Sequence, residues 1–401
     1  MQIEARGLIS DAALRGDAER ISYFTALCPL RSGTMLAGFQ MGRLKHGPDN
    51  SIGLCRSTDG GESWSAIPFR FETRLEGTPG SLAGAEMVEV APGRVLLFAT
   101  WFDRSDRERP LFDPVTEGLL RSRQLMAVST DEGLSWSPWR EVSTPGLTGC
   151  ALTGPVTAWS DGTIAFAFES FKEFDDPKPA RHAAWLLISR DGGETFHPPW
   201  QVAQHPEHTL YYWDQRLCPT STAGEFIALF WTHDRAAQRD RRVHFLRASI
   251  GDAQSENGLP TSGHSLPVET TIPGQIAAPV LLEDGRLFAF VVDRDQPGTL
   301  TLWQSLDGGV SWPSDSRLIV HQQAELAKLS QGREQIDFAL VSRRRTPAAI
   351  GRRTIGESLD DRRSICPCLP STARSQSARG LETTARVPLA DGQSIAINRE
   401  R

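Results

Sequence analysis

The residues best suited to chemistry are concentrated in one short run, HTLYYWDQR, at positions 208–216. It holds two of the chain's three tyrosines, with an acid and a base, directly before an apolar segment that predicts a strand. A phenol beside a carboxylate can act as a nucleophile with its base, and a guanidinium can hold an anion. We therefore predict catalytic roles for Tyr211 and Tyr212, and substrate binding by Asp214, Gln215 and Arg216. The same pattern also fits a strand edge that packs against a neighbouring sheet.

Four further charged residues lie where predicted strands begin or end. Asp49 precedes the apolar run 52–57, Glu86 opens another run, Glu169 ends a third, and Arg43 follows a fourth. Carboxylates can transfer protons, so Glu86 is a candidate catalytic partner carboxylate. Each carboxylate has a structural alternative, because Asp49 lies among turn-forming neighbours and the two glutamates fit solvated strand ends.

The elements that position these residues are pairs of apolar runs, each pair separated by a glycine. They recur five times, and each pair predicts a β-hairpin. The central glycines are Gly33, Gly93, Gly162, Gly224 and Gly285. The distance from each glycine to the next repeated motif leaves room for two more strands, which predicts four-stranded blades.

The repeated motif is S-x-D-x-G-x-x-[WF], present in full at 57–64, 129–136, 189–196 and 305–312. A fifth copy is degenerate: Ser249 is in phase, but Gly251 replaces the aspartate. In such a turn the aspartate can accept backbone N–H bonds, the glycines can adopt positive φ, and the aromatic ring can pack on the sheet. We therefore expect the motif aspartates to be structural.

This motif at blade spacing resembles the Asp box, or bacterial neuraminidase repeat, of the sialidase superfamily. The resemblance covers about residues 20 to 320 and implies an all-β, six-bladed β-propeller, of which five blades are clear from the sequence. In that family, three arginines hold the sugar carboxylate, a tyrosine attacks with help from a glutamate, and an aspartate is the acid/base. By position Asp49 matches the aspartate, and Arg43 lies where these enzymes commonly have an arginine, so the resemblance implies a catalytic role for Asp49 and substrate binding by Arg43. The first-blade arginine is replaced, because its place falls on the run 23–25, Tyr-Phe-Thr.

The composition of the chain changes after about residue 330. All 11 tryptophans precede this point, whereas 13 arginines and a single aromatic residue, Phe338, occur from Arg333 onward. Such a composition is poor at building a core. We predict a propeller domain over 1–330 and a disordered or aberrant tail over 331–401, in which only 387–396 resembles another blade hairpin. A shifted reading frame would produce a similar break.

Composition and charge narrow the possible partners. The net charge of -6 argues against nucleic acid, and no apolar run is long enough to span a membrane, so we expect neither partner and a cytoplasmic location. The six cysteines show no metal-ligand or disulfide pattern, and three of them, Cys28, Cys55 and Cys218, lie in apolar runs that predict burial. No metal and no cofactor is expected, and the oligomeric state is left open.

Two functions from different classes fit these features. The first is a glycoside hydrolase of the exo-α-sialidase type, acting on sialic acid or another acidic sugar. The second is a non-catalytic propeller that binds a glycan or a protein, and a defective copy of such an enzyme is a third reading. The predicted partner in the first two readings is a glycan or a small acidic sugar.

Overall fold

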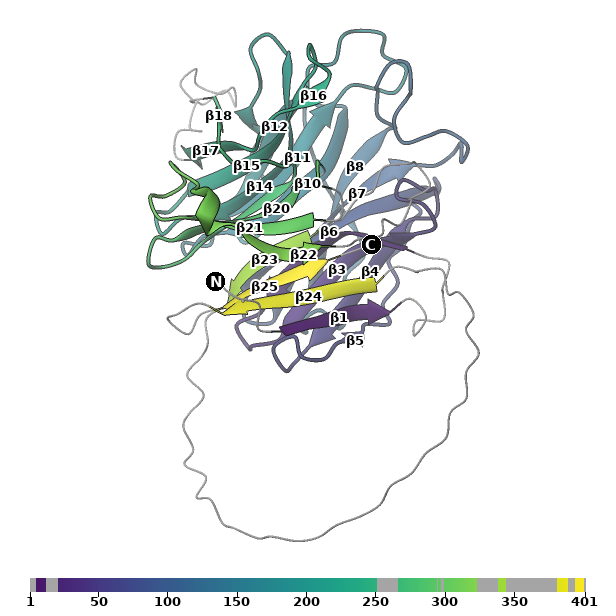
Figure 1. Ribbon diagram of the computed structural model, residues 1–401. Helices are drawn as coiled ribbons and strands as arrows, with labels where there is room; N and C mark the ends of the chain where they lie inside the picture. The colour runs from purple at the N-terminus through teal and green to yellow at the C-terminus, as the bar shows by residue number, and fades with distance from the viewer. Residues whose placement is uncertain are drawn as a thin grey trace, which may run out of the picture.

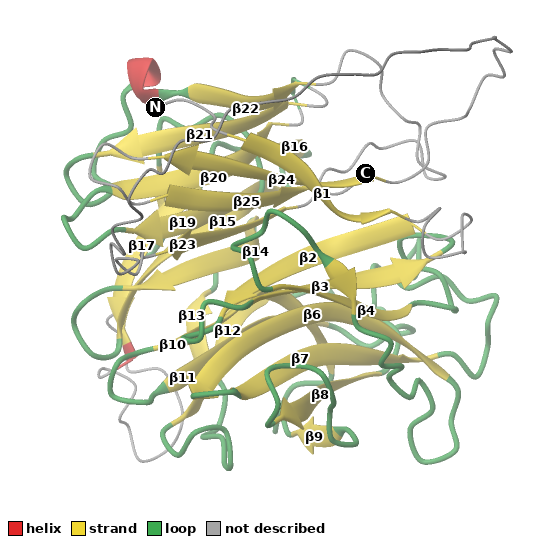
Figure 2. Ribbon diagram, turned by 90° about the horizontal axis from the view of Figure 1, so that it is seen from below, coloured by secondary structure: helices red, strands yellow, loops and turns green. Residues whose placement is uncertain are grey.

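The computed structural model describes residues 5–11, 21–250, 266–293, 295–296, 299–322, 338–343, 381–388 and 394–399. Most of these residues form strands, and the one helix of three or more residues among them is the short 3-10 helix η2, Ser314–Ser316. Figure 2 shows the same dominance of strands over helix. The prediction of an all-β chain is confirmed. No helix among the described residues is long and apolar enough to cross a membrane.

Five antiparallel sheets follow one another along the chain, each with its strands in sequence order from the axis outward (Figure 1). They are blade 1 (β2 Ile21–Pro29, β3 Met35–Gly42, β4 Ser51–Ser57, β5 Ser65–Ala66), blade 2 (β6 Gly80–Ala91, β7 Arg94–Asp103, β8 Ser122–Ser129, β9 Arg140–Val142), blade 3 (β10 Gly149–Ala158, β11 Ile164–Phe171, β12 Ala183–Ser189, β13 Trp200–Ala203), blade 4 (β14 Leu210–Pro219, β15 Glu225–Asp234, β17 His244–Ser249, β18 Val268–Glu269, with β16 Arg239–Asp240 beside β15) and blade 5 (β19 Ala277–Leu281, β20 Leu287–Asp293, β21 Thr299–Ser305, β22 Leu318–Gln322). The innermost strands of successive blades contact one another, as in a propeller.

The repeated sequence features fall at fixed places in these blades. All five hairpin glycines lie between the first and second strands, with φ from 73° to 92°. The serine that opens each motif is the last residue of the third strand, and the degenerate copy at Ser249 follows the same rule in β17. The blade periodicity predicted from the sequence is therefore confirmed for five blades.

A further four-stranded sheet lies beside the five blades, in the order β1-β24-β25-β23. It consists of β1 Ala5–Asp11, β23 Phe338–Arg343, β24 Leu381–Pro388 and β25 Ser394–Arg399. Figure 1 shows β1, in purple, beside the yellow β24. Strand β23 contacts both β2 and β19, and the pairing of β24 with β25 includes the hairpin predicted at 387–396. The rest of 331–401 lies outside the described residues, so the division at residue 330 stays a prediction.

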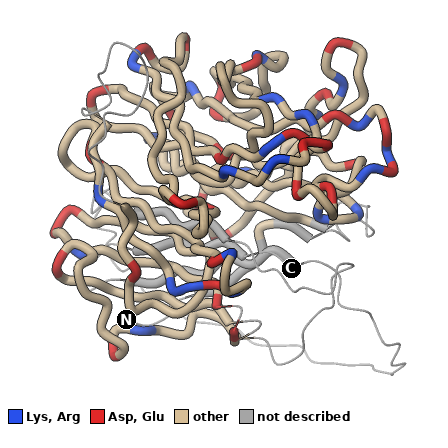
Figure 3. The backbone as a smooth tube through the Cα atoms, turned by 90° about the horizontal axis from the view of Figure 1, so that it is seen from above, with Lys and Arg blue, Asp and Glu red and all other residues tan. Residues whose placement is uncertain are grey.

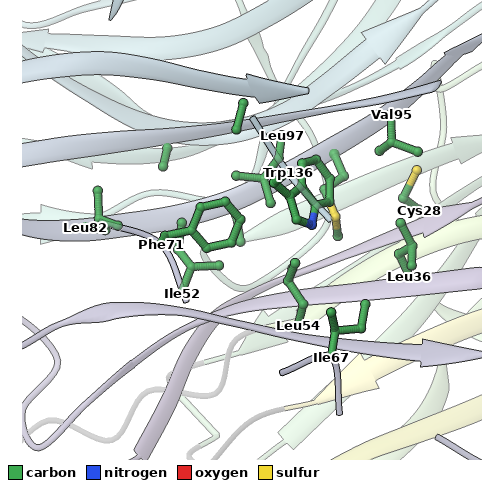
Figure 4. Packing of buried hydrophobic residues seen from close by; sticks show 14 of the residues in the cluster. Cys28, Leu36, Ile52, Leu54, Ile67, Phe71, Leu82, Val95, Leu97 and Trp136 are labelled. Carbon is green, nitrogen blue, oxygen red and sulfur yellow. The ribbon is translucent and has the colours of Figure 1, made fainter. Parts of the chain in front are cut away.

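The hydrophobic core lies mainly between neighbouring blades. Between blades 1 and 2, for example, Leu36 and Leu54 pack with Val95, Leu97 and Trp136, all of them buried (Figure 4). Equivalent clusters join blades 2 and 3, blades 3 and 4, and blades 4 and 5. The four described cysteines are buried, as predicted for Cys28, Cys55 and Cys218.

The four full motifs share one hydrogen-bond pattern. In each, the serine hydroxyl donates to the aspartate and accepts from the N–H of the glycine four residues after the serine, and the aspartate also accepts an N–H four residues after itself. These bonds lower the pKa of the aspartates, to about 2 for Asp307, where the bond from Ser311 is the largest cause. The aspartates thus stabilise turns, as the sequence suggests.

The motif of one blade also contacts the blade before it. A Cβ atom on Gly133 of blade 2 would lie 2.7 Å from Leu36 Cδ1 of blade 1, and one on Gly193 of blade 3 would lie 2.5 Å from Leu96 of blade 2. Arg56 of blade 1 also pairs with Glu132 of blade 2 at 2.7 Å. The motif therefore fastens neighbouring blades together as well as closing its own turn.

Candidate functional site

The innermost strands of blades 1 to 4 are all irregular near the same end. Their antiparallel register breaks within residues 23–26, 83–86, 152–156 and 213–216. Phe24, Gly84 and Asp214 in these breaks have positive φ values of 51°, 74° and 45°. Bulges and strained φ values occur often at functional sites, because they turn a side chain out of the sheet.

Adjacent bulges touch one another. A Cβ atom on Gly84 would lie 2.4 Å from Leu152, and one on Gly154 would lie 2.0 Å from the carbonyl oxygen of Gln215. Only glycine allows this close approach of neighbouring backbones. The bulges of blades 2, 3 and 4 therefore form one continuous packed floor.

A cavity of about 480 Å³ lies on this floor, and we call it the aromatic cavity. Its volume is within the range of small-molecule sites. Seven Phe, Tyr and Trp side chains from the four blades supply much of its wall: Phe24, Phe102, Phe112, Phe171, Tyr211, Trp213 and Trp231. Trp213 packs against Trp231 and stacks on His233, with ring centroids 5.0 Å and 4.9 Å apart. Such a wall suits the apolar faces of a sugar ring.

Among the carboxyl groups that line the aromatic cavity, those of Glu169 and Asp214 belong to neighbouring residues at the bulge of β14. Glu169 is 1% exposed and accepts a hydrogen bond from the backbone N–H of Asp214. Burial, and then the charge of Asp214, raise the pKa of Glu169 well above its ordinary value. The bulge therefore holds a buried carboxyl with a raised pKa, Glu169, beside a half-buried one, Asp214.

His182 lies behind this pair. Its Nε2 atom is 3.2 Å from the carbonyl oxygen of Tyr212 and 3.5 Å from Glu169 Oε2. Burial lowers the pKa of His182 to about 4, so the ring is neutral at neutral pH. The ring centroid of Tyr211 is 5.1 Å away, and Tyr211 also lines the cavity.

A loop of blade 2 reaches over the cavity to blades 3 and 4. Glu117 in this loop accepts a hydrogen bond from Arg235 of blade 4 at 2.7 Å, and the Leu119 N–H donates to Lys172 of blade 3. The guanidinium of Arg235 lies 4.9 Å from the ring centroid of Tyr211. A cation and an anion are thus both present at the cavity wall.

Arg104 joins this loop to blade 1. It is 2% exposed and donates to the carbonyl oxygens of Arg109 and His46 and to the Ser81 hydroxyl. Because His46 also lines the cavity, Arg104 fixes two parts of the cavity wall at once.

Charges elsewhere are mixed in sign. Figure 3 shows blue and red segments side by side, mostly along loops. A larger groove of about 1200 Å³ runs along loops and strand ends of blades 2 and 3, but none of the bulge residues lines it. The part of the chain that the structure describes contains no group of three or more His, Cys, Asp or Glu residues suited to a metal ion.

The structure brings some of the predicted site residues together and separates others. Tyr211 and Asp214 line the aromatic cavity. Glu86 and Arg216 line a second cavity of about 480 Å³, which lies among the later parts of the innermost strands. Neither set includes Arg43, Asp49, Tyr212 or Gln215.

The four residues outside both cavities have other surroundings. Arg43 is exposed, and Asp49 is half-buried in the turn after the cavity-lining residues Lys45 and His46. Tyr212 is 2% exposed and packs inside blade 4 against Phe230. Gln215 is fully buried and donates to the carbonyl oxygens of Phe168 and Trp185 at 3.0 Å and 2.8 Å, so it ties blade 4 to blade 3.

Several cavity residues gave little signal in the sequence. Glu169 could be singled out as a carboxylate at the end of an apolar run, but not as the partner of Asp214. His182, Glu117 and Arg235 lie in polar segments without a motif. Only the fold brings them within one cavity.

Comparisons with known proteins agree with this architecture. No protein-family model matches the chain. It is 23% identical over 296 residues to a sialidase from Bacteroides fragilis (strain YCH46), which is 68% of this chain and 49% of that protein. The chain thus spans about half the length of this curated relative.

Solved structures give the same result for the fold. A protein of unknown function from Dyadobacter fermentans aligns with a TM-score of 0.63 and 13% identity, covering 100% of this chain and 98% of that one. The Hadza microbial sialidase Hz136 aligns with a TM-score of 0.55 and 18% identity, over 76% and 59% of the two chains. An intramolecular trans-sialidase from Ruminococcus gnavus, in complex with oseltamivir carboxylate, aligns with a TM-score of 0.52 and 12% identity over 83% and 89%. At such identities the likeness establishes the fold.

Proposed function

We propose that this chain, which is a sialidase-like β-propeller, is a glycoside hydrolase whose reaction takes place in the aromatic cavity. The observation that carries the proposal is the pair of carboxyl groups at the bulges, Glu169 and Asp214, side by side in a wall of aromatic rings. Glycoside hydrolysis usually needs two carboxyl groups, one of which has a raised pKa and acts as the general acid. The sheet of β1 and β23–β25, which contacts blades 1 and 5, supports a propeller of six blades.

Glu169 is the proposed general acid. Because its burial beside Asp214 raises its pKa, it carries a proton at neutral pH that it can give to a leaving group. Asp214 is more exposed to the cavity and is the proposed base or nucleophile. The proposal moves the acid role away from Asp49, which does not line the cavity.

Tyr211 is the one predicted tyrosine that faces the cavity. Its hydroxyl is buried without a hydrogen-bond partner among the described residues, and burial raises its pKa. Without a carboxylate in hydrogen-bond reach, the phenol is not activated as a nucleophile. We assign it to binding.

The proposed substrate is a glycoside of sialic acid or another acidic sugar. Lys45, Lys172 and Arg235 supply positive charge to the cavity wall. The sialidase-type relatives support this class, and the trans-sialidase complex is one with a carboxylate ligand.

The test is turnover of fluorogenic 4-methylumbelliferyl glycosides of N-acetylneuraminate, glucuronate and neutral sugars. Glu169→Gln and Asp214→Asn should each reduce turnover of the preferred glycoside by about 10²- to 10⁴-fold. Asp161→Asn, in an exposed hairpin turn of blade 3, is the control and should retain activity. Unchanged turnover in both cavity variants would remove these carboxyl groups from the mechanism.

One observation favours the alternative, a non-catalytic glycan-binding propeller: Asp49, the match to the family's acid, lies outside the cavity. A well-folded protein that binds an acidic sugar but cleaves no glycoside in the panel would support this alternative.

A further inference from the structure

Two polar atoms on neighbouring buried rings of the aromatic cavity have no hydrogen-bond partner in the described structure. They are the hydroxyl oxygen of Tyr211 and Nδ1 of His182, on residues that are 6% and 3% exposed. Both residues line the cavity, and their rings are 5.1 Å apart. Leaving such atoms unpaired is costly, so native proteins nearly always satisfy them with water or a ligand.

The surroundings of His182 fix the kind of partner that it needs. A backbone carbonyl oxygen can only accept, so Nε2, at 3.2 Å from Tyr212 O, must carry the proton. The buried ring is neutral, and Nδ1 is therefore an acceptor. It requires a donor from the ligand and would repel the oxygen of an anion.

Tyr211 supplies the complementary group. Its hydroxyl can donate a hydrogen bond and also accept one, and it lies on the next blade, beside the His182 ring. A ligand hydroxyl between the two can donate to His182 Nδ1 while its oxygen accepts from Tyr211. An anionic oxygen could satisfy Tyr211 but not His182.

We propose that Tyr211 and His182 form a subsite that binds one neutral hydroxyl group of a sugar. The inference rests on the proposed function only in taking the aromatic cavity as the sugar site, and it does not depend on turnover. Aromatic rings flank the subsite: the ring of Phe171 is 5.2 Å from that of His182, and the ring of Trp213 is 5.5 Å from that of Tyr211.

The experiment is a double-mutant cycle on sugar affinity, measured through the fluorescence of cavity tryptophans such as Trp213. The probes are N-acetylneuraminic acid, D-glucuronic acid and D-galactose. Tyr211→Phe removes only the hydroxyl, and His182→Phe removes the acceptor but keeps a ring. Each should weaken binding about tenfold, the effect of one lost hydrogen bond to a neutral group.

The double variant decides whether the two residues share one hydroxyl. If they do, the double variant should lose clearly less than the product of the two single losses, because both bonds hold the same hydroxyl in place and the loss of one already weakens the other. Losses that multiply to about a hundredfold would show two independent sites and would overturn the shared subsite. Tyr212→Phe, whose ring packs inside blade 4, is the matched control and should bind within twofold of the wild type.

Other outcomes separate this proposal from that of hydrolysis. Sugar binding that is unchanged in Tyr211→Phe and His182→Phe, or absent in the folded wild type for all three probes, refutes the subsite. Binding with the expected losses but without cleavage of any glycoside supports the subsite and refutes only the hydrolase proposal.

Discussion

Replacing Gly133 by alanine tests whether the repeated motif fastens one blade to the next. Gly133 has φ of 85°, and an added Cβ would lie 2.7 Å, 3.0 Å and 3.4 Å from three atoms of Leu36 on blade 1. Leu36 is fully buried, so it cannot move into solvent. An alanine at positive φ costs about 1–2 kcal/mol, and crowding in a packed core costs about 1–3 kcal/mol more. The free energy of unfolding should therefore fall by about 2–5 kcal/mol.

Gly162→Ala is the control for the backbone part of this cost. Gly162 has φ of 86°, nearly the same as Gly133, but a Cβ there meets no described atom within 4 Å. It should cost only about 1–2 kcal/mol. Urea denaturation of both variants, followed by tryptophan fluorescence, measures the difference. Equal destabilisation by the two substitutions would show that the contact between the motif and the preceding blade contributes nothing.

Three further predictions concern groups around the aromatic cavity. The folded state is stabilised by neutral His182 in full above pH 6.5, and this stability is lost as the pH falls toward the lowered pKa of about 4. At 1.36 kcal/mol per pKa unit the loss is about 3 kcal/mol. Denaturation measured at a series of pH values should show this loss in the wild type and a smaller one in His182→Phe. Glu169 has the opposite effect, because its raised pKa makes the folded state lose stability as the pH rises. At pH 8, Glu169→Gln should therefore unfold at a higher temperature than the wild type while losing activity. A lower melting temperature would contradict this prediction. Arg104→Met should cost about 2–4 kcal/mol through lost buried hydrogen bonds and should weaken sugar binding, whereas the exposed neighbour Arg107→Met should do neither in the same denaturation and fluorescence assays.

The blades could be predicted because their signals are local. A glycine with positive φ, a serine at a strand end and an aromatic residue seven positions later all fall within a few residues of one another. The recognition of a sialidase-like propeller depended on these signals and is confirmed. The sixth sheet gave a weaker signal, because it combines β1 with strands that follow residue 337 and only one of its hairpins has the repeated pattern.

The cavity was harder to predict because alternation along a strand decides which side chains face it. Tyr211 faces the cavity and Tyr212 packs inside the blade, although both lie in the same favourable run. The bulge then shifts the alternation: Asp214 faces the cavity, whereas Gln215 is buried between blades. A strand with regular pairing would have placed these residues differently.

The strand register places the residues that stabilise each blade and the residues that line the cavity at opposite ends of the sheet. In blade 1, Pro29 pairs with Met35 and Met35 with Ser57, so the hairpin glycine and the repeated motif share one end of the sheet. The bulge at Phe24 and the cavity-lining loop lie toward the other end, and each of the next three blades also has its bulge toward the start of the first strand. Substitutions at the two ends should therefore have separable effects. Gly133→Ala should lower the free energy of unfolding and leave the sugar affinity of the folded protein unchanged, whereas Tyr211→Phe should lower the affinity without destabilising the fold. A loss of affinity in folded Gly133→Ala would show that the two ends of the blades are coupled.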